Sequence, residues 1–401
     1  MNTTNQFVQL LQSFDLESFL TQNKQMDASR FLLAHKGNTN DLNWLLAEQI
    51  KLYPKALHKL PHFVKNHCWF TSKSYEQASG EASALYKSKL ISGAKLLDLS
   101  GGLGVDDWAF SRNFDKVVSL DPDEKLNEIV RENFRRLHCN NIERINITAE
   151  SYLNSNLDHF DLIYLDADRR PAQGKSYFLD HDDPNFLAIQ DACFKRSNQI
   201  LLKLSPMADI HYLQENLQHI EKIMVVGDKK EVKEVLVLLN KKGSTTIIYE
   251  SVLLRENEPH QIFSSKKELT LSISSELKSA KYFFEPHVTI IKAQHSRNYA
   301  QACELEQLAI NSAFYIGNHI PPEFMGRSFE IVKAFEFSKS LFQQYLKNEK
   351  LVKANITKRN FVLSVEEIRK AYKIKEGGKD YLFFSTLSNG TRMVYHCIKA
   401  V

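Results

Sequence analysis

Residues 96–106 read Leu-Leu-Asp-Leu-Ser-Gly-Gly-Leu-Gly-Val-Asp, and they decide the fold of this 401-residue chain. The apolar segment Lys95–Leu99 has the composition of a buried strand, and a glycine turn leads from it into an amphipathic helix. Glycine is needed in such a turn because a side chain would hold the backbone away from a nucleotide-like ligand. The stretch therefore predicts a strand, a turn that contacts a ligand, and a helix.

A second predicted strand, Lys116–Leu120, ends in Asp121, seventeen residues beyond Gly104. An acid at this place can accept hydrogen bonds from both ribose hydroxyls of a nucleoside. Asp98, Gly102, Gly104 and Asp121 thus outline a nucleoside site at the carboxyl ends of the first two strands of a doubly wound sheet. The alternative is a glycine turn that binds no ligand.

The glycine spacing argues against a nicotinamide cofactor. A dinucleotide fold needs G-x-G-x-x-G, and Asp107 occupies the third glycine position when counting starts at Gly102. The pattern that remains, Asp98-x-Ser100-x-Gly102-x-Gly104, resembles the acidic-x-Gly-x-Gly-x-Gly signature of class I S-adenosylmethionine (SAM) methyltransferases. SAM carries an ammonium and a sulfonium but no phosphate, so a carboxylate beside the turn suits it better than it would suit pyrophosphate.

Strands continue to alternate with helices after Asp121. A helix is predicted at Glu124–Leu137, followed by strands near 145–147, at Phe160–Leu165 and at Gln199–Leu204. This rhythm indicates a mostly parallel sheet with its ligand site at the strand C-termini. The last strands of the sheet are expected near 223–226 and 245–251. The cofactor-binding residues predicted from the motif and the resemblance are Asp98, Ser100, Gly101, Gly102, Gly104, Asp121, Glu150 and Asp166.

The segment that follows the fourth predicted strand reads Asp166-Ala167-Asp168-Arg169-Arg170-Pro171. Class I methyltransferases hold the methyl acceptor there, and amino-methylating members often have Asn/Asp-Pro-Pro-aromatic, whose ring stacks on a flipped base. This chain keeps the acid, Asp166, but has Arg169 at the aromatic position. We expect Asp166 to orient an acceptor nitrogen or take its proton. Arg169 and Arg170 either clamp the substrate or brace the loop through its aspartates.

The resemblance extends over nearly the whole chain. The sequence looks like a bacterial group of class I methyltransferases in which the catalytic domain precedes a ferredoxin-like domain and a THUMP-like domain. That group usually has Asp-Pro-Ala-Arg-Arg where this chain has Asp-Ala-Asp-Arg-Arg. THUMP domains bind structured RNA, notably tRNA, so the resemblance implies an RNA substrate. The matching stretches are 43–50, 100–106, 164–170, 203–210, 284–286, 322–330 and 356–363.

The expected architecture is α/β: a Rossmann-like class I methyltransferase sheet with an N-terminal helical region and small α+β C-terminal domains. In the first region Asp41 can cap a helix through Gln49, which Tyr53-Pro54 then interrupts. Later elements are expected as strands at 283–291 and 313–316, a helix at 299–311, a capping box at 364–367 and a hairpin at Asn389-Gly390. The predicted domains are residues 1–65 (helical), 66–255 (methyltransferase), 256–330 (ferredoxin-like) and 331–401 (THUMP-like).

Composition favours a cytoplasmic protein. The five cysteines are scattered and show no C-x-x-C, which argues against structural disulfides and a zinc cluster. The polar N-terminus shows no secretory signal, and no apolar run approaches the ~20 residues of a membrane span. The 14 histidines show no metal-ligand spacing, so no metal is expected.

Charge is distributed unevenly along the chain. Residues 331–401 carry fourteen Lys and Arg and six Asp and Glu, a net charge of +8, whereas the whole chain carries +4. A basic module on a slightly acidic body suggests a polyanionic partner, although a solvated lysine-rich surface is equally compatible with charge alone. Lys353, Lys358 and Arg359 lie among polar and aromatic residues and are the predicted RNA-binding residues.

The sequence thus predicts a SAM-dependent methyltransferase that acts on RNA, at a base nitrogen or amino group of tRNA. Two alternatives remain open. A small-molecule methyltransferase would need a closed, apolar acceptor pocket and would not use a basic module. An RNA-binding protein with an inactive SAM fold would bind RNA and transfer nothing.

Overall fold

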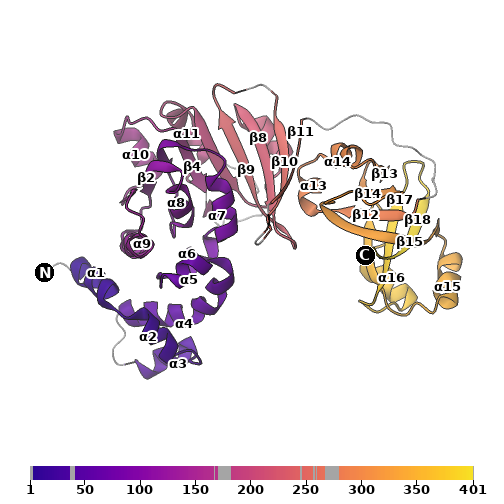
Figure 1. Ribbon diagram of the computed structural model, residues 1–401, viewed down its shortest axis with the longest axis horizontal. Coiled ribbons are helices and arrows are strands. Elements are labelled where there is room, and N and C mark those ends of the chain that lie inside the picture. The colour runs from indigo at the N-terminus through magenta and orange to yellow at the C-terminus, as the bar shows by residue number, and fades with distance from the viewer. Residues whose placement is uncertain are drawn as a thin grey trace. The chain divides into compact units, whose positions relative to one another are not determined.

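The computed structural model describes residues 3–36, 41–166, 168–169, 182–243, 246–255, 258, 260–266 and 280–400. These residues form two compact units (Figure 1). The first comprises Met1–Glu221 and Glu234–Thr245, and the second comprises Lys222–Lys233 and Thr246–Val401. None of the described helices is long and apolar enough to cross a membrane.

The described part of the first unit begins with seven helices. Their apolar residues form one core with buried residues of α8 (Val105–Phe110) and α9 (Glu124–Arg136), the first two helices that follow strands of the sheet. Trp69 and Trp108, both almost fully buried, lie in this shared core. The predicted interruption at Pro54 is wrong, because the helix continues through it: Leu52, Tyr53 and Ala56 are buried on either side, and their packing offsets the lost backbone hydrogen bond. The helices are α1 (Thr3–Ser13), α2 (Leu16–Gln22), α3 (Ala28–Ala34), α4 (Asp41–Lys59), α5 (Pro61–Lys65), α6 (Ser72–Gln77) and α7 (Glu81–Ser88).

The sheet of the first unit has the strand order β3-β2-β1-β4-β7-β9. All neighbours pair in parallel except β7 and β9, which are antiparallel. Leu162–Leu165 of β4 are almost completely buried, as expected of a central parallel strand. The strands are β1 (Gly93–Asp98), β2 (Phe114–Leu120), β3 (Ile142–Ile145), β4 (Leu162–Asp166), β7 (Gln199–Leu204) and β9 (Val232–Asn240), and the helices are α8 (Val105–Phe110), α9 (Glu124–Arg136), α10 (Ala149–Ser155), α11 (Phe186–Phe194) and α12 (Ile210–Asn216).

This architecture confirms the predicted Rossmann-like sheet. The predicted first, second, fourth and fifth strands correspond to β1, β2, β4 and β7, and the third begins three residues earlier than expected. Strand β9 was not predicted. Its apolar run, residues 235–239, fits a buried strand and a buried helix equally well. The antiparallel pairing with β7 makes it a strand.

The second unit contains a short sheet segment and a seven-stranded sheet. In the segment, β8 and β10 pair in parallel, and β11 pairs antiparallel with β10. The seven strands follow the order β13-β14-β12-β15-β18-β17-β16. The strands are β8 (Ile220–Gly227), β10 (Ile248–Leu253), β11 (Gln261–Ser265), β12 (Tyr282–Pro286), β13 (Glu306–Ala309), β14 (Ser312–Gly317), β15 (Gly326–Glu336), β16 (Asn355–Arg359), β17 (Asp380–Thr386) and β18 (Arg392–Lys399).

The seven-stranded sheet curls around an aromatic core. Phe283, Phe314, Phe329, Phe383 and Tyr395 form a buried cluster with ring centroids 4.4–5.5 Å apart. The curl brings β16 into contact with β14, its distant neighbour in strand order. Helices pack on the outer faces of this sheet: α13 (Val288–Lys292), α14 (Ser296–Ala302), α15 (Lys339–Asn348) and α16 (Val365–Tyr372).

Two predictions in the second unit are wrong in detail. The predicted strand 283–291 ends at Pro286, and the His287 side chain caps α13 instead. The predicted helix 299–311 ends at Ala302, since Glu304 adopts a left-handed backbone (φ 54°) and the chain then forms β13.

The capping box at Ser364 and Glu367 and the hairpin between β17 and β18 are confirmed. The predicted domain boundary at residue 330 falls inside β15, so both predicted C-terminal domains contribute strands to one sheet.

Candidate active site

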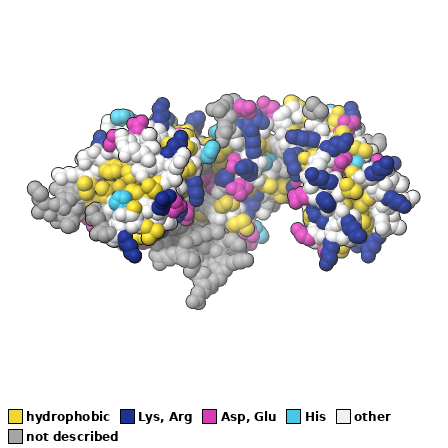
Figure 2. Space-filling model, turned by 90° about the horizontal axis from the view of Figure 1, so that it is seen from below, with side chains coloured by type: hydrophobic (Ala, Val, Ile, Leu, Met, Phe, Trp, Pro, Cys, Tyr) yellow, Lys and Arg dark blue, Asp and Glu magenta, His cyan; other side chains and the backbone are white. Residues whose placement is uncertain are grey.

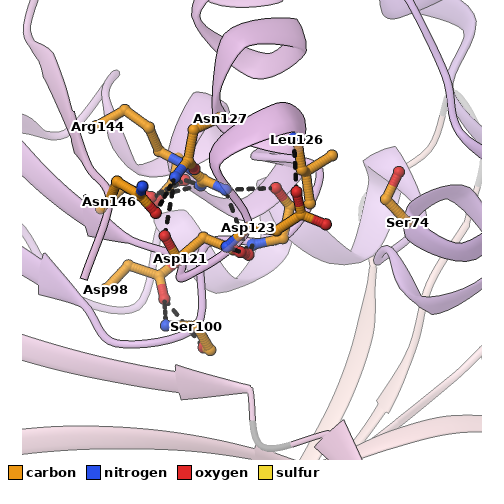
Figure 3. Close-up of polar contacts among 12 residues, drawn as sticks. Ser74, Asp98, Ser100, Asp121, Asp123, Leu126, Asn127, Arg144 and Asn146 are labelled. Carbon is orange, nitrogen blue, oxygen red and sulfur yellow. Dashed lines mark hydrogen bonds and ion pairs between the residues drawn. The ribbon is translucent and has the colours of Figure 1, made fainter. Parts of the chain in front are cut away.

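A cavity of about 1320 Å³ lies at the carboxyl ends of β1, β2, β4 and β7, within the first unit. Seven of the eight predicted cofactor residues line it: Asp98, Ser100, Gly101, Gly102, Asp121, Glu150 and Asp166. Figure 3 shows Asp98, Ser100 and Asp121 on one side of this space and Ser74, from α6, on the other. The structure therefore brings the strand-end residues together around one hollow, as the parallel topology requires.

The surroundings of the three glycines in the turn differ, so each position disfavours a side chain for its own reason. A Cβ at Gly102 (φ +47°) would have its nearest neighbour, the Ser100 carbonyl oxygen, at 3.7 Å, so a side chain there would extend toward the cavity. Gly104 (φ +78°) precedes α8 and does not line the cavity; a Cβ there would lie 2.6 Å from Phe134. A Cβ at Gly101 would lie 1.9 Å from the Arg144 guanidinium. Of these three glycines, only Gly102 has open space where a side chain would lie, and Gly101 and Gly104 make room for protein side chains.

Asp121 stands at the end of β2 and is held in place by the glycine turn. Its Oδ2 accepts a hydrogen bond of 3.0 Å from the backbone N–H of Gly102, and its Oδ1 accepts one of 2.9 Å from that of Asp123 (Figure 3). These two contacts fix the orientation of the Asp121 carboxylate, as an acid that is expected to bind a ribose requires.

Arg144, on β3, is a residue that sequence reasoning missed. Its fully buried guanidinium donates to Ser119 Oγ (2.8 Å), to the Gly102 carbonyl (2.7 Å) and to Asn127 Oδ1 (2.6 Å), and lies 3.4 Å from Asp121 Oδ2. It thereby ties the glycine turn to Asp121. No local signal marked it, because β3 is an edge strand and the partners of Arg144 lie on other elements.

Asp98 is 1% exposed, and its Oδ1 accepts hydrogen bonds from the backbone and hydroxyl of Ser100 (2.7 and 3.0 Å). Burial, together with the neighbouring carboxyl group of Asp107, raises the pKa of Asp98 well above its ordinary value. Burial also raises the pKa of Asp107, although the Arg144 charge opposes that shift. Each of these buried carboxyl groups therefore keeps its proton to a higher pH than an exposed aspartate does.

Asp166 ends β4 and forms an ion pair with Lys203 at the end of β7, with 2.5 Å between Oδ2 and Nζ. Both side chains line the cavity and are partly exposed, at 26% and 16%. Burial raises the pKa of Asp166, and the Lys203 charge partly offsets this. Burial lowers the pKa of Lys203, but the charges of Asp166 and Glu234 outweigh it, so its pKa is raised. Lys203 is thus a charged partner that fixes the predicted catalytic carboxylate.

A second missed cluster surrounds Lys87 of α7, whose side chain is 0% exposed. Its Nζ lies 2.8 Å from Asp106 Oδ1 and 3.3 Å from Glu234 Oε2, and it donates to Ser79 Oγ and Tyr164 Oη. Burial raises the pKa of Asp106, but the Lys87 charge and hydrogen bonds outweigh it and the pKa is lowered. Ser79 and Asp106 also line the cavity, so this network supports its floor.

The predicted acceptor-loop arginines lie largely outside the described structure. The backbone of β5 (Asp168–Arg169) pairs with β6 (Asp182–Asp183), but the side chain of Arg169 and all of Arg170 lie outside the described residues. The choice between clamping a substrate and bracing the loop therefore stays a prediction.

The predicted RNA-binding residues differ from one another in their surroundings. Lys353 and Lys358 are exposed. Arg359 lies 3.3 Å from Glu285 Oε1, donates to the Ala313 carbonyl, and stacks 4.6 Å from the Phe314 ring centroid. Arg359 thus ties β16 to β12 and β14, whereas the two lysines lie at the surface, where an external partner can reach them.

Comparisons with known proteins agree with this geometry. Residues 82–168 match the family described as conserved hypothetical protein 95, and residues 326–399 match the THUMP domain-like family. A solved structure from Porphyromonas gingivalis W83, described as a candidate methyltransferase, is 28% identical, covers 96% of this chain and 98% of its own, and superposes with a TM-score of 0.81. The chain is therefore a SAM-dependent methyltransferase, and its residues 326–399 are similar to the THUMP domain-like family.

Other solved structures match the methyltransferase over smaller shares. An rRNA methylase from Streptococcus thermophilus is 15% identical, covers 40% of this chain and 93% of its own, and has a TM-score of 0.30. A candidate methyltransferase from Streptococcus mutans, solved in complex with S-adenosylhomocysteine (SAH), is 15% identical, covers 40% and 96%, and has a TM-score of 0.31. No curated protein sequence matches the chain.

Among the described residues, no group of His, Cys, Asp and Glu is arranged to hold a metal ion.

The raised pKa of Asp98, which lines the cavity, predicts a pH-dependent affinity for SAM. The cationic cofactor favours the ionised form of Asp98, so binding releases a proton while the pH lies below the raised pKa. We expect SAM affinity to rise with pH from about 4, the ordinary Asp value, and to level off above the raised pKa. Calorimetry in buffers of different ionisation enthalpy measures the released proton.

Two controls apply to this measurement. SAH lacks the sulfonium charge and should show a weaker pH dependence, and Asp98→Asn should remove most of the dependence. A SAM affinity that does not change with pH would show that Asp98 does not face the cofactor's charge.

Proposed function

We propose that this methyltransferase transfers the methyl group of SAM to a base nitrogen or amino group of RNA, with tRNA as the preferred substrate class. The observation that carries the proposal is one cavity that holds both a nucleoside-type site at Asp121 and a carboxylate, Asp166, at the end of β4. The THUMP-like match over residues 326–399 supports RNA as the polymer.

The residues present fit SAM. Gly102 leaves its turn open toward the cavity, Asp121 is fixed for a ribose, and Asp98 lines the cavity with a carboxyl group whose ionised form a bound ammonium or sulfonium would favour. Glu150 is exposed at the cavity wall beyond Asp121, where adenine contacts are expected. SAM would supply an activated methyl group on sulfur.

Transfer then requires alignment more than covalent chemistry by the protein. The acceptor nitrogen's lone pair forms the new N–C bond as the C–S bond breaks and its electron pair passes to sulfur. Asp166 accepts a hydrogen bond from the acceptor N–H and so directs the lone pair. Its carboxylate, or water beside it, takes the proton that the methylated nitrogen releases. Lys203 holds that carboxylate in place through the 2.5 Å ion pair.

Asp166→Asn separates cofactor binding from chemistry. We expect kcat to fall by roughly 10²–10⁴-fold, the usual contribution of a positioned acid or base, while SAM affinity stays within a few-fold. The assay follows tritium from labelled SAM into the RNA, DNA and protein fractions of a strain that lacks the gene, with wild-type label expected in RNA.

Asp115→Asn is the matched control, because Asp115 is exposed at the opposite end of β2 from the cavity. Loss of SAM binding in Asp166→Asn, with no separate effect on turnover, would place Asp166 in the cofactor site. Label in no macromolecular fraction would favour a small-molecule acceptor.

The THUMP-like domain presents an exposed positive surface. Figure 2 shows many Lys and Arg side chains on the part of the surface that the C-terminal strands and helices form. Lys353 and Lys375 are neighbours across a parallel β-bridge, and the Lys353 side chain lies over Gly377 and Gly378. The structure thus gathers cations from two chain segments, which suits contact with phosphates.

Replacing Lys353 and Lys358 together by Ala should weaken binding to many RNAs alike, because phosphate contacts carry no sequence information. The slope of log affinity against log salt should fall by about 0.7–0.9 per lost phosphate contact. Filter binding of unfractionated tRNA over a salt series measures both effects.

Lys229→Ala with Lys230→Ala is the control pair, since it removes the same charge from an exposed turn outside the THUMP-like domain. Equal affinity in both double variants would count against a docking role for this surface. Arg359 is left unchanged because its contacts with Glu285 and Ala313 hold the sheet together.

A further inference from the structure

The N-terminal helices supply one wall of the active-site cavity. Asp41, Trp44, Leu45 and Glu48 of α4 all line it, and their spacing of three and four residues places them on one face of the helix. The two ends of this face are tied to the sheet region: Asp41 Oδ1 lies 2.7 Å from Lys125 Nζ, and Glu48 Oε1 accepts a 2.9 Å hydrogen bond from the Ser72 backbone N–H.

Trp44 stands out on that face. Its relative exposure is 56%, whereas the other two tryptophans of the chain, Trp69 and Trp108, are 0% and 2% exposed. Tryptophan is seldom left so exposed, because burying its ring is strongly favourable. An indole fixed on a helix at the edge of a ligand cavity offers a flat surface on which a nucleobase can stack.

The cavity has room for a second ligand beside the cofactor. Its volume of about 1320 Å³ exceeds the roughly 300–1,000 Å³ typical of a site for one small molecule. The nucleoside end is already lined by strand-end residues such as Leu120, Asp121 and Glu150. Trp44 belongs to a different element of the wall, and the aromatic residues among the described lining residues are only Phe7 and Trp44.

The acceptor motif lacks the aromatic that stacks on a flipped base, since Arg169 takes that position. We propose that Trp44 supplies the missing platform: its indole stacks on the base that is to be methylated, holding it between α4 and Asp166. Lys73, exposed on the same rim, would contact the adjoining phosphate. This inference rests on the proposed RNA methyltransferase function and adds a specificity-determining residue to it.

Tryptophan fluorescence tests the proposal directly, because Trp44 is the exposed one of three tryptophans. The full-length protein is saturated with SAH, which fills the cofactor site, and is then titrated with unfractionated tRNA. We expect tRNA to quench the exposed component of the emission and to protect it from iodide. Trp44→Phe should lack this component and leave only the emission of the buried Trp69 and Trp108.

Kinetics of methyl transfer provide the second readout. Trp44→Ala should lower kcat/KM for RNA by about 5- to 150-fold, the range expected for one lost base stack, with SAH affinity unchanged. Trp44→Phe should restore most of the activity because it keeps an aromatic face. The melting temperature of each variant checks that it is folded.

Three results would overturn the proposal. A matching loss of SAH affinity in Trp44→Ala would assign Trp44 to the adenine of the cofactor. Unchanged Trp44 emission on tRNA binding would show that no base reaches it. A Trp44→Phe variant as impaired as Trp44→Ala would exclude stacking as the reason. Failure of the proposed function would be seen differently: the wild-type protein would bind SAM but transfer no methyl group to RNA. The emission experiment does not depend on methyl transfer, so the two failures can be told apart.

Discussion

Asp121→Ala will strongly weaken the binding of both SAM and SAH. The variant would remove the charged acceptor to which we expect both ribose hydroxyls to donate, and each such hydrogen bond is worth at most about 1.5–3 kcal/mol. The combined loss corresponds to roughly 10²–10⁴-fold in Kd. Isothermal calorimetry with each ligand measures it, and the effect should be equal for both because they share the ribose.

Asp123→Ala is the matched control for this experiment. Asp123 also lines the cavity, but its Oδ1 caps α9 by accepting a 2.9 Å hydrogen bond from the Leu126 backbone N–H. Its loss should cost about 1 kcal/mol of stability and little affinity. Unchanged SAM affinity in Asp121→Ala would contradict the assignment of the ribose site.

Lys87→Ala will destabilise the first unit strongly. The fully buried ammonium faces the carboxylates of Asp106 and Glu234, both of which would lose their ion-pair partner. Breaking a buried pair by removing one partner typically costs about 3–5 kcal/mol. Urea denaturation, followed by the fluorescence of the buried Trp69 and Trp108 in the first unit, measures the change in free energy of unfolding.

Lys116→Ala provides the comparison. Its ion pair with Glu143 is of similar length, 2.6 Å, but both side chains are about half exposed. Removing it should cost less than about 1 kcal/mol. If the two variants lost equal stability, the buried network would not be held together by the Lys87 charge. Adding Glu234→Gln to Lys87→Ala should recover part of the loss, since one unpaired carboxylate then disappears.

Much of the catalytic architecture could be predicted because its causes are local. The strand–glycine turn–helix unit at Lys95–Phe110 follows from hydrophobic periodicity and from the need for glycine, and the acid at Asp121 follows from its place after the next strand. Once strands are known to be parallel, their carboxyl ends must meet, and this brought Asp98, Asp121 and Asp166 to one cavity.

Partners across the sheet could not be predicted in the same way. Nothing in the local sequence distinguishes the buried charged residues Arg144, Lys203, Lys87 and Glu234 from exposed ones. Their partners lie on other elements, and Lys87 and Glu234, for instance, are 147 residues apart in the chain. Short-range patterns contain no information on which charges meet in the interior. The same holds for β9 and β13, whose strands are fixed by pairing with β7 and β14.

Three features could be predicted from the residues alone, because each depends on positions close together in the chain: the parallel sheet, the glycine turn and the resemblance to class I methyltransferases. Three others are visible only in the folded protein: Gly101 makes room for Arg144, Arg359 braces the curled sheet, and α4 presents Trp44 to the cavity. These features depend on side chains that meet after folding, where close packing and the cost of leaving a buried charge unpaired select their partners.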